Sequence, residues 1–197
     1  MNIKKIASTA LTFTINRLIE ILAVGILIIG LLLLIALIYY SPNDPNFIFP
    51  ENTKIQNLLG FQGSYVSDLF FQSVGLISYL ISLTLIFTGI NIFKSKDLFL
   101  LIENIFFSIL YSIFGSLFFS FFYQNSFSLF INGNGGFVGN YLNQSFLSDL
   151  IKFQINFSYY VLILVISGLF LISVNFNPKK FWDFLNRIIK LFIKDNN

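Results

Sequence analysis

Residues 21–40 constrain the fold most, because the stretch ILAVGILIIGLLLLIALIYY contains no charged side chain. A helix rises about 1.5 Å per residue, so about 20 residues cross the roughly 30 Å hydrocarbon core of a bilayer. A helix on the surface of a soluble protein keeps a polar stripe, and this stretch has none. Arg17 precedes it and the sequence SPNDP at 41–45 ends it. The stretch predicts a transmembrane helix, so the fold is expected to be arranged around a bilayer.

The composition agrees with a membrane protein and excludes several kinds of chemistry. Only 11% of the residues are charged, whereas an average soluble domain carries about 25%. The mean hydropathy is +0.80. The chain contains no cysteine and no histidine, which removes thiolate catalysis, disulfides and the commonest zinc ligands. We therefore expect no catalytic residue, no metal site and no cofactor.

Four apolar stretches predict an all-α fold, an integral membrane bundle of four transmembrane helices with flanking amphipathic helices. The spans are expected at about 18–40, 66–93, 98–123 and 153–174, with external loops at about 41–65 and 124–152. Prolines keep the first loop irregular. The charge-free run at 104–148 is too long for one span, and the sequence NGNGG at 132–136 divides it. Ser67 and Asp68 are expected to cap the second span. A short interfacial helix is expected near 137–151.

The basic residues predict how the bundle is oriented. Ten of the twelve lysines and arginines lie in segments 1–17, 94–97 and 175–197, and only Lys54 and Lys152 lie elsewhere. The positive-inside rule then places both termini and the central turn in the cytoplasm. The two terminal segments are expected to be amphipathic helices on the membrane surface. A cleaved signal peptide is the alternative for the N-terminus, which Arg17 disfavours by interrupting the early apolar run.

Small residues recur on the predicted second and third spans. Residues of this kind let membrane helices approach closely, and their hydroxyls can form hydrogen bonds across the contact. We expect the two rows to pack against each other. The alternative is that the hydroxyls bond to carbonyl groups of their own helix. The two rows are Gly75, Ser78, Ser82 and Gly89 on the second span, and Ser108, Ser112, Ser116 and Ser120 on the third.

Three motifs carry a family resemblance. The first is RLIEI at 17–21, entering the long apolar helix that leaves through YSPNDP at 40–45. The second is LGFQGSYVSDL at 59–69, with Gly75 and Tyr79 further on, and the third is GNGGFVG at 133–139. In this order the motifs resemble the N-terminal membrane domain of the FtsK/SpoIIIE DNA translocase family over nearly the whole chain. The motif residues are Ser41, Asp44, Pro45, Gly60, Gly63, Asp68, Gly75, Gly135, Gly136 and Gly139.

The resemblance implies a membrane anchor that acts in cell division and chromosome segregation at the septum of the bacterial inner membrane. It also implies self-association, as a hexamer, and contacts with divisome membrane proteins. In the family a linker leads to a separate cytoplasmic ATPase that pumps DNA. This sequence contains no G-x-x-x-x-G-K-[ST] motif, so we expect it neither to hydrolyse ATP nor to bind DNA directly. A fragment, a split-gene product and a stand-alone anchor all fit this expectation.

The motif residues also have purely structural interpretations. Gly60 and Gly63 are consistent with an ordinary loop. Gly133, Gly135 and Gly136 suit either an anion-binding nest of N–H groups or, more simply, a flexible turn. Asp44 could contact a partner or cap its own turn.

Two other functions also remain open. A small transporter or channel subunit is the alternative function, and it predicts a polar path at mid-depth. Glu20, Asp68 and Glu103 lie near span ends rather than at mid-depth. A structural membrane protein with no link to division is the other possibility.

Overall fold

The computed structural model describes residues 3–45, 54–124 and 132–179, with Trp182 and Asn186, and side chains from Ser8 onward. Four helical stretches are long and apolar enough to cross a membrane, namely Ser8–Ile38, Gly60–Ser95, Phe99–Phe122 and Ile155–Ser173. This confirms the predicted all-α membrane fold, and the described residues contain no strand. The elements are α1 (Ile3–Ile38), α2 (Gly60–Val74), η1 (Gly75–Ile77), α3 (Ser78–Ser95), α4 (Phe99–Phe122), α5 (Gly136–Asn143), α6 (Phe146–Phe153) and α7 (Ile155–Ser173).

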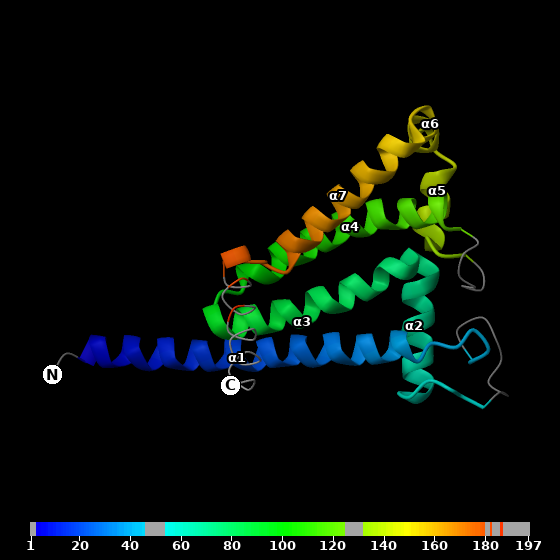
Figure 1. Ribbon diagram of the computed structural model, residues 1–197. Helices are drawn as coiled ribbons and strands as arrows, with labels where there is room; N and C mark the ends of the chain where they lie inside the picture. Colours follow the sequence, from blue (N-terminus) through cyan, green and yellow to red (C-terminus); the bar gives the residue numbers. More distant parts are fainter. Residues whose placement is uncertain (1–2, 46–53, 125–131, 180–181, 183–185, 187–197) are drawn as a thin grey trace, which may run out of the picture.

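The bundle has two distinct ends (Figure 1). At one end lie α2, α5, α6 and the described residues that flank them, and we call this the loop end. At the other lie the short turn between α3 and α4 and the C-terminal end of α7, and we call this the turn end. The N-terminal part of α1 projects beyond the rest of the bundle on the side of the turn end. The described parts of both terminal segments therefore lie on the side of the turn end.

The first helix is longer than the predicted span. Residues 3–17, expected as a separate surface helix, continue α1 without a break. Glu20 joins this part of α1 to the α3–α4 turn, because its carboxylate pairs with Arg17 and with Lys96 Nζ at 2.6 Å. Most of the expected tail helix, together with residues 46–53 and 125–131 of the loops, lies outside the described residues.

The predicted second span is divided in the structure. α2 begins at Gly60 and runs across the end of α1, whereas α3 runs along α1 (Figure 1). The chain turns between them at Gly75, whose φ of 71° and ψ of −147° are accessible to glycine and strained for other residues. Ser67 and Asp68 lie inside α2, so the prediction that they cap the span is wrong. The apolar run is unbroken in sequence, and its division depends on a glycine conformation that hydropathy does not report.

Close backbone contact joins α1 to α3. A Cβ atom on Gly30 would lie 2.8 Å from the backbone nitrogen of Ile86, and one on Gly89 would lie 2.7 Å from the carbonyl oxygen of Ala23. Gly89 therefore faces α1 rather than the third span, where the sequence hypothesis placed it. If larger residues replaced the glycines at this contact, the backbones of α1 and α3 could not lie this close together.

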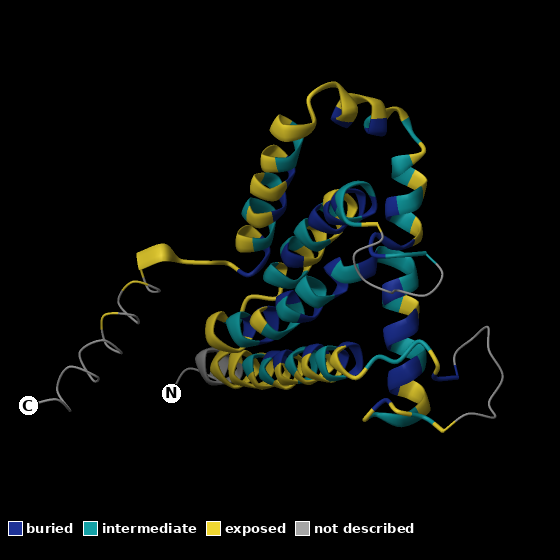
Figure 2. Ribbon diagram, turned by 45° about the vertical axis from the view of Figure 1, so that its right-hand side comes forward, coloured by how far each residue is buried: buried dark blue, intermediate teal, exposed yellow. Residues whose placement is uncertain are grey.

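Hydrogen bonds between polar side chains join α3, α4 and α7, together with Asn175 just after α7. Thr84 Oγ1 lies 2.9 Å from the Tyr111 hydroxyl and 3.0 Å from Ser173 Oγ. Asn104 donates to Thr88 Oγ1 at 2.8 Å and to Asn175 Oδ1 at 3.1 Å. Buried residues line the inner faces of the helices, and exposed residues cover much of their outer surface (Figure 2). Large apolar side chains are prominent among the exposed ones, which is expected where lipid is the solvent.

Candidate functional site

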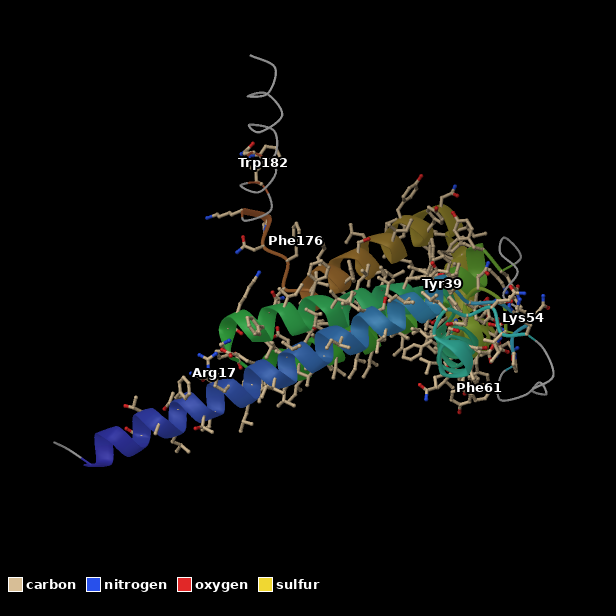
Figure 3. All side chains as sticks on the ribbon, turned by 90° about the horizontal axis from the view of Figure 1, so that it is seen from below. Arg17, Tyr39, Lys54, Phe61, Phe176 and Trp182 are labelled. Carbon is tan, nitrogen blue, oxygen red and sulfur yellow. The ribbon has the colours of Figure 1, made fainter. Side chains whose placement is uncertain are left out.

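The family-motif residues at 40–45, 59–69 and 133–139 meet at the loop end, on and around α2, whereas RLIEI at 17–21 lies toward the other end of α1. We call this assembly the α2 platform: α2 itself with residues 39–45, 54–59 and 132–139, which pack against it or against the end of α1. Tyr39, Lys54 and Phe61 lie at this end of the molecule, and Arg17 lies toward the other end of α1 (Figure 3). Each part of the platform is stabilised by hydrogen bonds or close contacts with backbone atoms of another segment, which the sequence alone does not predict.

Asp44 and Asn57 lock the first loop onto the end of α1. The Asp44 carboxylate is 2% exposed and accepts hydrogen bonds from the backbone N–H groups of Gln56 at 2.9 Å and Asn57 at 2.8 Å. The Asn57 amide donates to the carbonyl oxygens of Ala36 at 2.9 Å and Tyr39 at 3.2 Å. The last carbonyl groups of a helix have no partner inside it, so Asn57 acts as a cap supplied by a distant residue.

The glycines of the second motif allow α2 to begin next to Asp44 and Asn57. A Cβ atom on Gly63 would lie 2.2 Å from Asn57 Oδ1, so no larger residue fits without moving the cap. Gly60 has a φ of 67° and donates its N–H to the carbonyl oxygen of Asn57 at 2.9 Å. Ser64 Oγ donates to the carbonyl oxygen of buried Pro45 at 2.9 Å. Asp44, Pro45, Gly60 and Gly63 therefore belong to one packed corner.

Asp68 lies in the middle of α2 and faces the end of α1. Its carboxylate accepts a hydrogen bond from the Tyr40 hydroxyl at 3.2 Å and one from Gln72 Nε2 at 3.4 Å. Burial, and then the negative charge of Asp68, raise the pKa of the Tyr40 hydroxyl well above its usual range. Tyr40 therefore stays protonated and acts as a hydrogen-bond donor to Asp68.

The third motif packs directly against the turn at Gly75. The carbonyl oxygen of Asn134 accepts the backbone N–H of Leu76 at 2.9 Å, and a Cβ atom on Gly75 would lie 1.9 Å from that oxygen. Gly136 has a φ of 64°, and a Cβ atom there would lie 2.6 Å from the backbone nitrogen of Gly75. These positions need glycine because two backbones touch where a side chain would stand.

Gly135 and Gly139 bring the same motif onto α4. A Cβ atom on either residue would lie within 2.4 Å of the carbonyl oxygen of Ser116. Ser116 Oγ donates to the carbonyl oxygen of Val74 at 2.9 Å, and Ser120 Oγ donates to Asn140 Oδ1 at 3.0 Å. The end of α4 is thus bonded both to the α2–η1 turn and to α5.

The remaining predicted packing serines play more local roles. Ser78 donates to the carbonyl oxygens of Gly75 at 2.6 Å and of Phe70 in α2 at 3.1 Å. Ser82 donates to the carbonyl oxygen of Tyr79, and Ser108 donates to that of Asn104 in its own helix. Ser112 Oγ is buried and has no hydrogen-bond partner among the described residues. On α4, therefore, Ser116 and Ser120 bond to other elements, whereas Ser108 and Ser112 do not.

The chemistry available at the platform is hydrogen bonding and apolar packing. No group of three or more carboxylate side chains that could share a metal ion occurs among the described residues. The Asp44 carboxylate accepts two backbone N–H groups, and the Asp68 carboxylate accepts two side-chain donors. Exposed apolar side chains, including Leu58 and Phe61, give the platform a surface that a partner or lipid can contact.

Several structurally important residues were not singled out from the sequence. Asn57 caps α1, and Asn132 joins the loop to α2 through hydrogen bonds with the side chain and the carbonyl group of Gln72. Thr84 and Tyr111 form the buried link between α3 and α4. For Thr84 and Tyr111 the available signal was a polar group inside an apolar run, since such a group needs a partner in lipid; no such signal marked the loop residues Asn57 and Asn132.

Comparisons with known proteins agree with the motifs. Residues 16–182 match the family described as "4TM region of DNA translocase FtsK/SpoIIIE". A DNA translocase FtsK of Rickettsia prowazekii is 37% identical over 82 residues, which is 40% of this chain and 11% of that protein. Those of Rickettsia typhi and Rickettsia bellii are 36% and 35% identical, over 35% and 39% of this chain and 9% and 10% of their own lengths.

The aligned part of this chain thus covers about a tenth of the curated relatives. No solved structure matches the chain. The family match covers most of the sequence, and the four apolar helices that it includes make this a multi-pass protein of the inner membrane. The chain belongs to the family of the 4TM region of DNA translocase FtsK/SpoIIIE.

Proposed function

We propose that this chain is the membrane anchor of a septal DNA translocase and acts in cell division and chromosome segregation. The observation that carries the proposal is the match of residues 16–182 to the membrane region of FtsK/SpoIIIE. An anchor of this kind works mechanically, because it determines where in the membrane a cytoplasmic motor operates. The chain itself is then no enzyme and makes no direct contact with DNA.

The arrangement of the bundle supports a division of labour between its two ends. The turn end carries the Arg17, Lys94 and Lys96 charges, so the positive-inside rule favours a cytoplasmic location for this end and for both termini. A motor joined to either terminus would then lie on the side where DNA is found. The α2 platform would lie on the outer side, within reach of divisome membrane proteins.

The motif residues would act in this proposal by keeping the platform rigid. Asp44, Gly63, Gly75 and Gly136 hold loop backbone against helix ends, and none of them offers a reactive group to a substrate. A rigid platform lowers the ordering entropy lost when a partner binds. Self-association, as a hexamer in this family, would place several platforms around one motor.

A small transporter or channel subunit is the second candidate function, and one observation bears on it. Polar side chains of α3, α4 and α7 meet inside the bundle, where a transport path would be expected. These groups donate to and accept from one another, and the cluster of Thr84, Thr88, Asn104, Tyr111 and Ser173 contains no carboxylate or amine. Mutual bonding of this kind favours helix packing over transport.

A fluorescent fusion in dividing bacteria tests the proposal. The wild-type chain is expected to concentrate at the septum, and the double variant Leu58→Ser/Phe61→Ser is expected to lose this enrichment because both side chains are exposed on the platform. Phe99→Ser is the control, since Phe99 lies at the turn end, is at least as exposed as Leu58 and Phe61, and should leave septal enrichment unchanged.

Thermal unfolding of the three purified proteins in detergent separates loss of contact from loss of folding. Even distribution of the wild-type chain around the cell would overturn the septal role. Solute movement into liposomes that contain the purified chain would favour the transporter instead.

A further inference from the structure

An apolar groove of about 380 Å³ lies beneath α2. Its walls come from three elements: Ile29, Leu32 and Ala36 of α1, the Gly63–Val66–Phe70 side of α2, and Leu85 of α3. Gln62 contributes a polar side chain at the α2 wall, and no charged residue lines the groove. The groove exists because α2 runs across the end of α1 instead of along it (Figure 1).

The depth of the groove in the membrane follows from α1. The charge-free stretch of α1 ends at Ile38, and Tyr39 and Tyr40 follow, as is typical of the level where hydrocarbon meets headgroups. Ile29 to Ala36 covers about 10 Å along the helix axis directly below that level. Ile29 is 59% exposed and Leu32 is 45% exposed, so the groove opens onto the lipid-facing surface of α1 rather than into the bundle.

An unfilled groove of this size would be unfavourable. Its walls would lose dispersion contacts on one side, and such contacts make up much of the packing energy of a membrane protein. Water would not fill it, because a buried water needs two to four polar partners and the walls are almost entirely apolar. Something apolar from the surroundings therefore occupies it.

The shape of the groove selects among apolar occupants. A helix with its side chains is about 10–12 Å across, so a helix of a second copy or of a partner would lie over the mouth without entering. A lipid acyl chain is a flexible rod of methylene groups that is already present at this depth. We infer that the groove beneath α2 is a binding site for one acyl chain of a phospholipid from the surrounding leaflet.

Photo-crosslinking after detergent exchange tests this site. The chain is prepared with Ile29→p-benzoylphenylalanine at the exposed mouth of the groove or with Leu22→p-benzoylphenylalanine on a lipid-facing part of α1 outside it. Each protein is extracted from membranes, washed extensively in dodecylmaltoside and irradiated, and its intact mass is measured. Position 29 is expected to form an adduct with the mass of a phospholipid, and position 22 an adduct with the detergent.

A filling variant provides the second measurement. Leu32→Trp places a larger side chain in the groove, and Leu22→Trp makes the same change elsewhere on α1. The fraction of protein that carries one phospholipid in native mass spectrometry is expected to fall about tenfold in Leu32→Trp, a loss of about 1.4 kcal/mol, and to be unchanged in Leu22→Trp. Four results would overturn the inference: a detergent adduct at position 29, a dimer mass there, no phospholipid on the washed wild-type protein, or equal retention by both variants.

This test does not depend on septal localisation. A chain that fails to reach the septum can still retain the phospholipid, and a chain that reaches the septum can still lack it. The two proposals therefore fail separately.

Discussion

Single residues at the loop end decide whether backbone segments can touch. Gly75 is the clearest case, because its φ of 71° is strained for other residues and a Cβ atom there would lie 1.9 Å from the Asn134 carbonyl oxygen. Gly75→Ala is expected to destabilise the protein by about 1–3 kcal/mol from backbone strain alone, with the steric clash adding to this. Unfolding in detergent micelles, followed by circular dichroism, measures the effect.

Gly25→Ala is the matched control for Gly75→Ala. Gly25 lies inside α1 and a Cβ atom there would meet nothing within 4 Å. Alanine is favoured over glycine in a helix by up to about 1 kcal/mol, so this variant is expected to be as stable as the wild type or more so. Equal stability of the two variants would mean that the close contact between Gly75 and the Asn134 carbonyl group does not constrain residue 75.

Asp44 carries a different kind of constraint, because its carboxylate is the acceptor for two buried backbone N–H groups. Asp44→Ala leaves both donors unpaired and is expected to destabilise the protein by about 1–3 kcal/mol. Asp44→Asn keeps one acceptor oxygen and is expected to lose less. Asp149→Ala is the control, since the Asp149 side chain is 80% exposed and is expected to have almost no effect.

The role of Asp44 was predictable only in part. A carboxylate between two prolines suggested a turn cap, and the structure does use it as an acceptor for backbone N–H groups. The donors, however, are Gln56 and Asn57, which lie beyond the 46–53 segment. No local rule connects these positions, because the contact depends on how the loop returns to the end of α1. The same limit applies to Asn57, whose partners are carbonyl groups about twenty residues earlier.

At the scale of helices, hydropathy predicted the existence of the elements better than their directions. The predominantly apolar runs that became α1, α4 and α7 each form a single helix. The run at 66–93 is also predominantly apolar, yet it divides at Gly75, where the backbone of Asn134 and Gly136 lies in contact with the chain. The pairing of helices was also hard to predict, since small residues on one face do not identify which neighbour they meet. Gly89 meets α1, and Ser116 meets the α2–η1 turn.

The link between α3 and α4 provides a test at this scale. Thr84→Val removes the hydroxyl that lies 2.9 Å from the Tyr111 hydroxyl, and Tyr111→Phe removes the other partner. A double-mutant cycle is expected to give a coupling free energy of about 0.6 kcal/mol, the mean for hydrogen bonds between membrane helices, and at most about 1.7 kcal/mol. Thr14→Val is the control, because Thr14 donates to Ala10 within exposed α1 and should show no coupling to Tyr111→Phe. Zero coupling for Thr84 would assign the contact to packing alone.

The whole molecule is organised by its two ends, and the absence of native cysteine makes this arrangement simple to test. Single cysteines are introduced by Ser8→Cys, Ser95→Cys and Asn177→Cys on the side of the turn end, and by Lys54→Cys and Asp149→Cys at the loop end. In spheroplasts a membrane-impermeant maleimide is expected to label the two loop-end cysteines directly, and the other three only after the membrane is permeabilised. The reason is that ten of the twelve basic residues belong to segments on the side of the turn end, where the positive-inside rule retains them. Labelling of Ser8→Cys and Asn177→Cys from opposite sides would require an odd number of crossings. In that case the four apolar helices could not all cross the membrane, and the arrangement with both termini on the side of the turn end would be wrong.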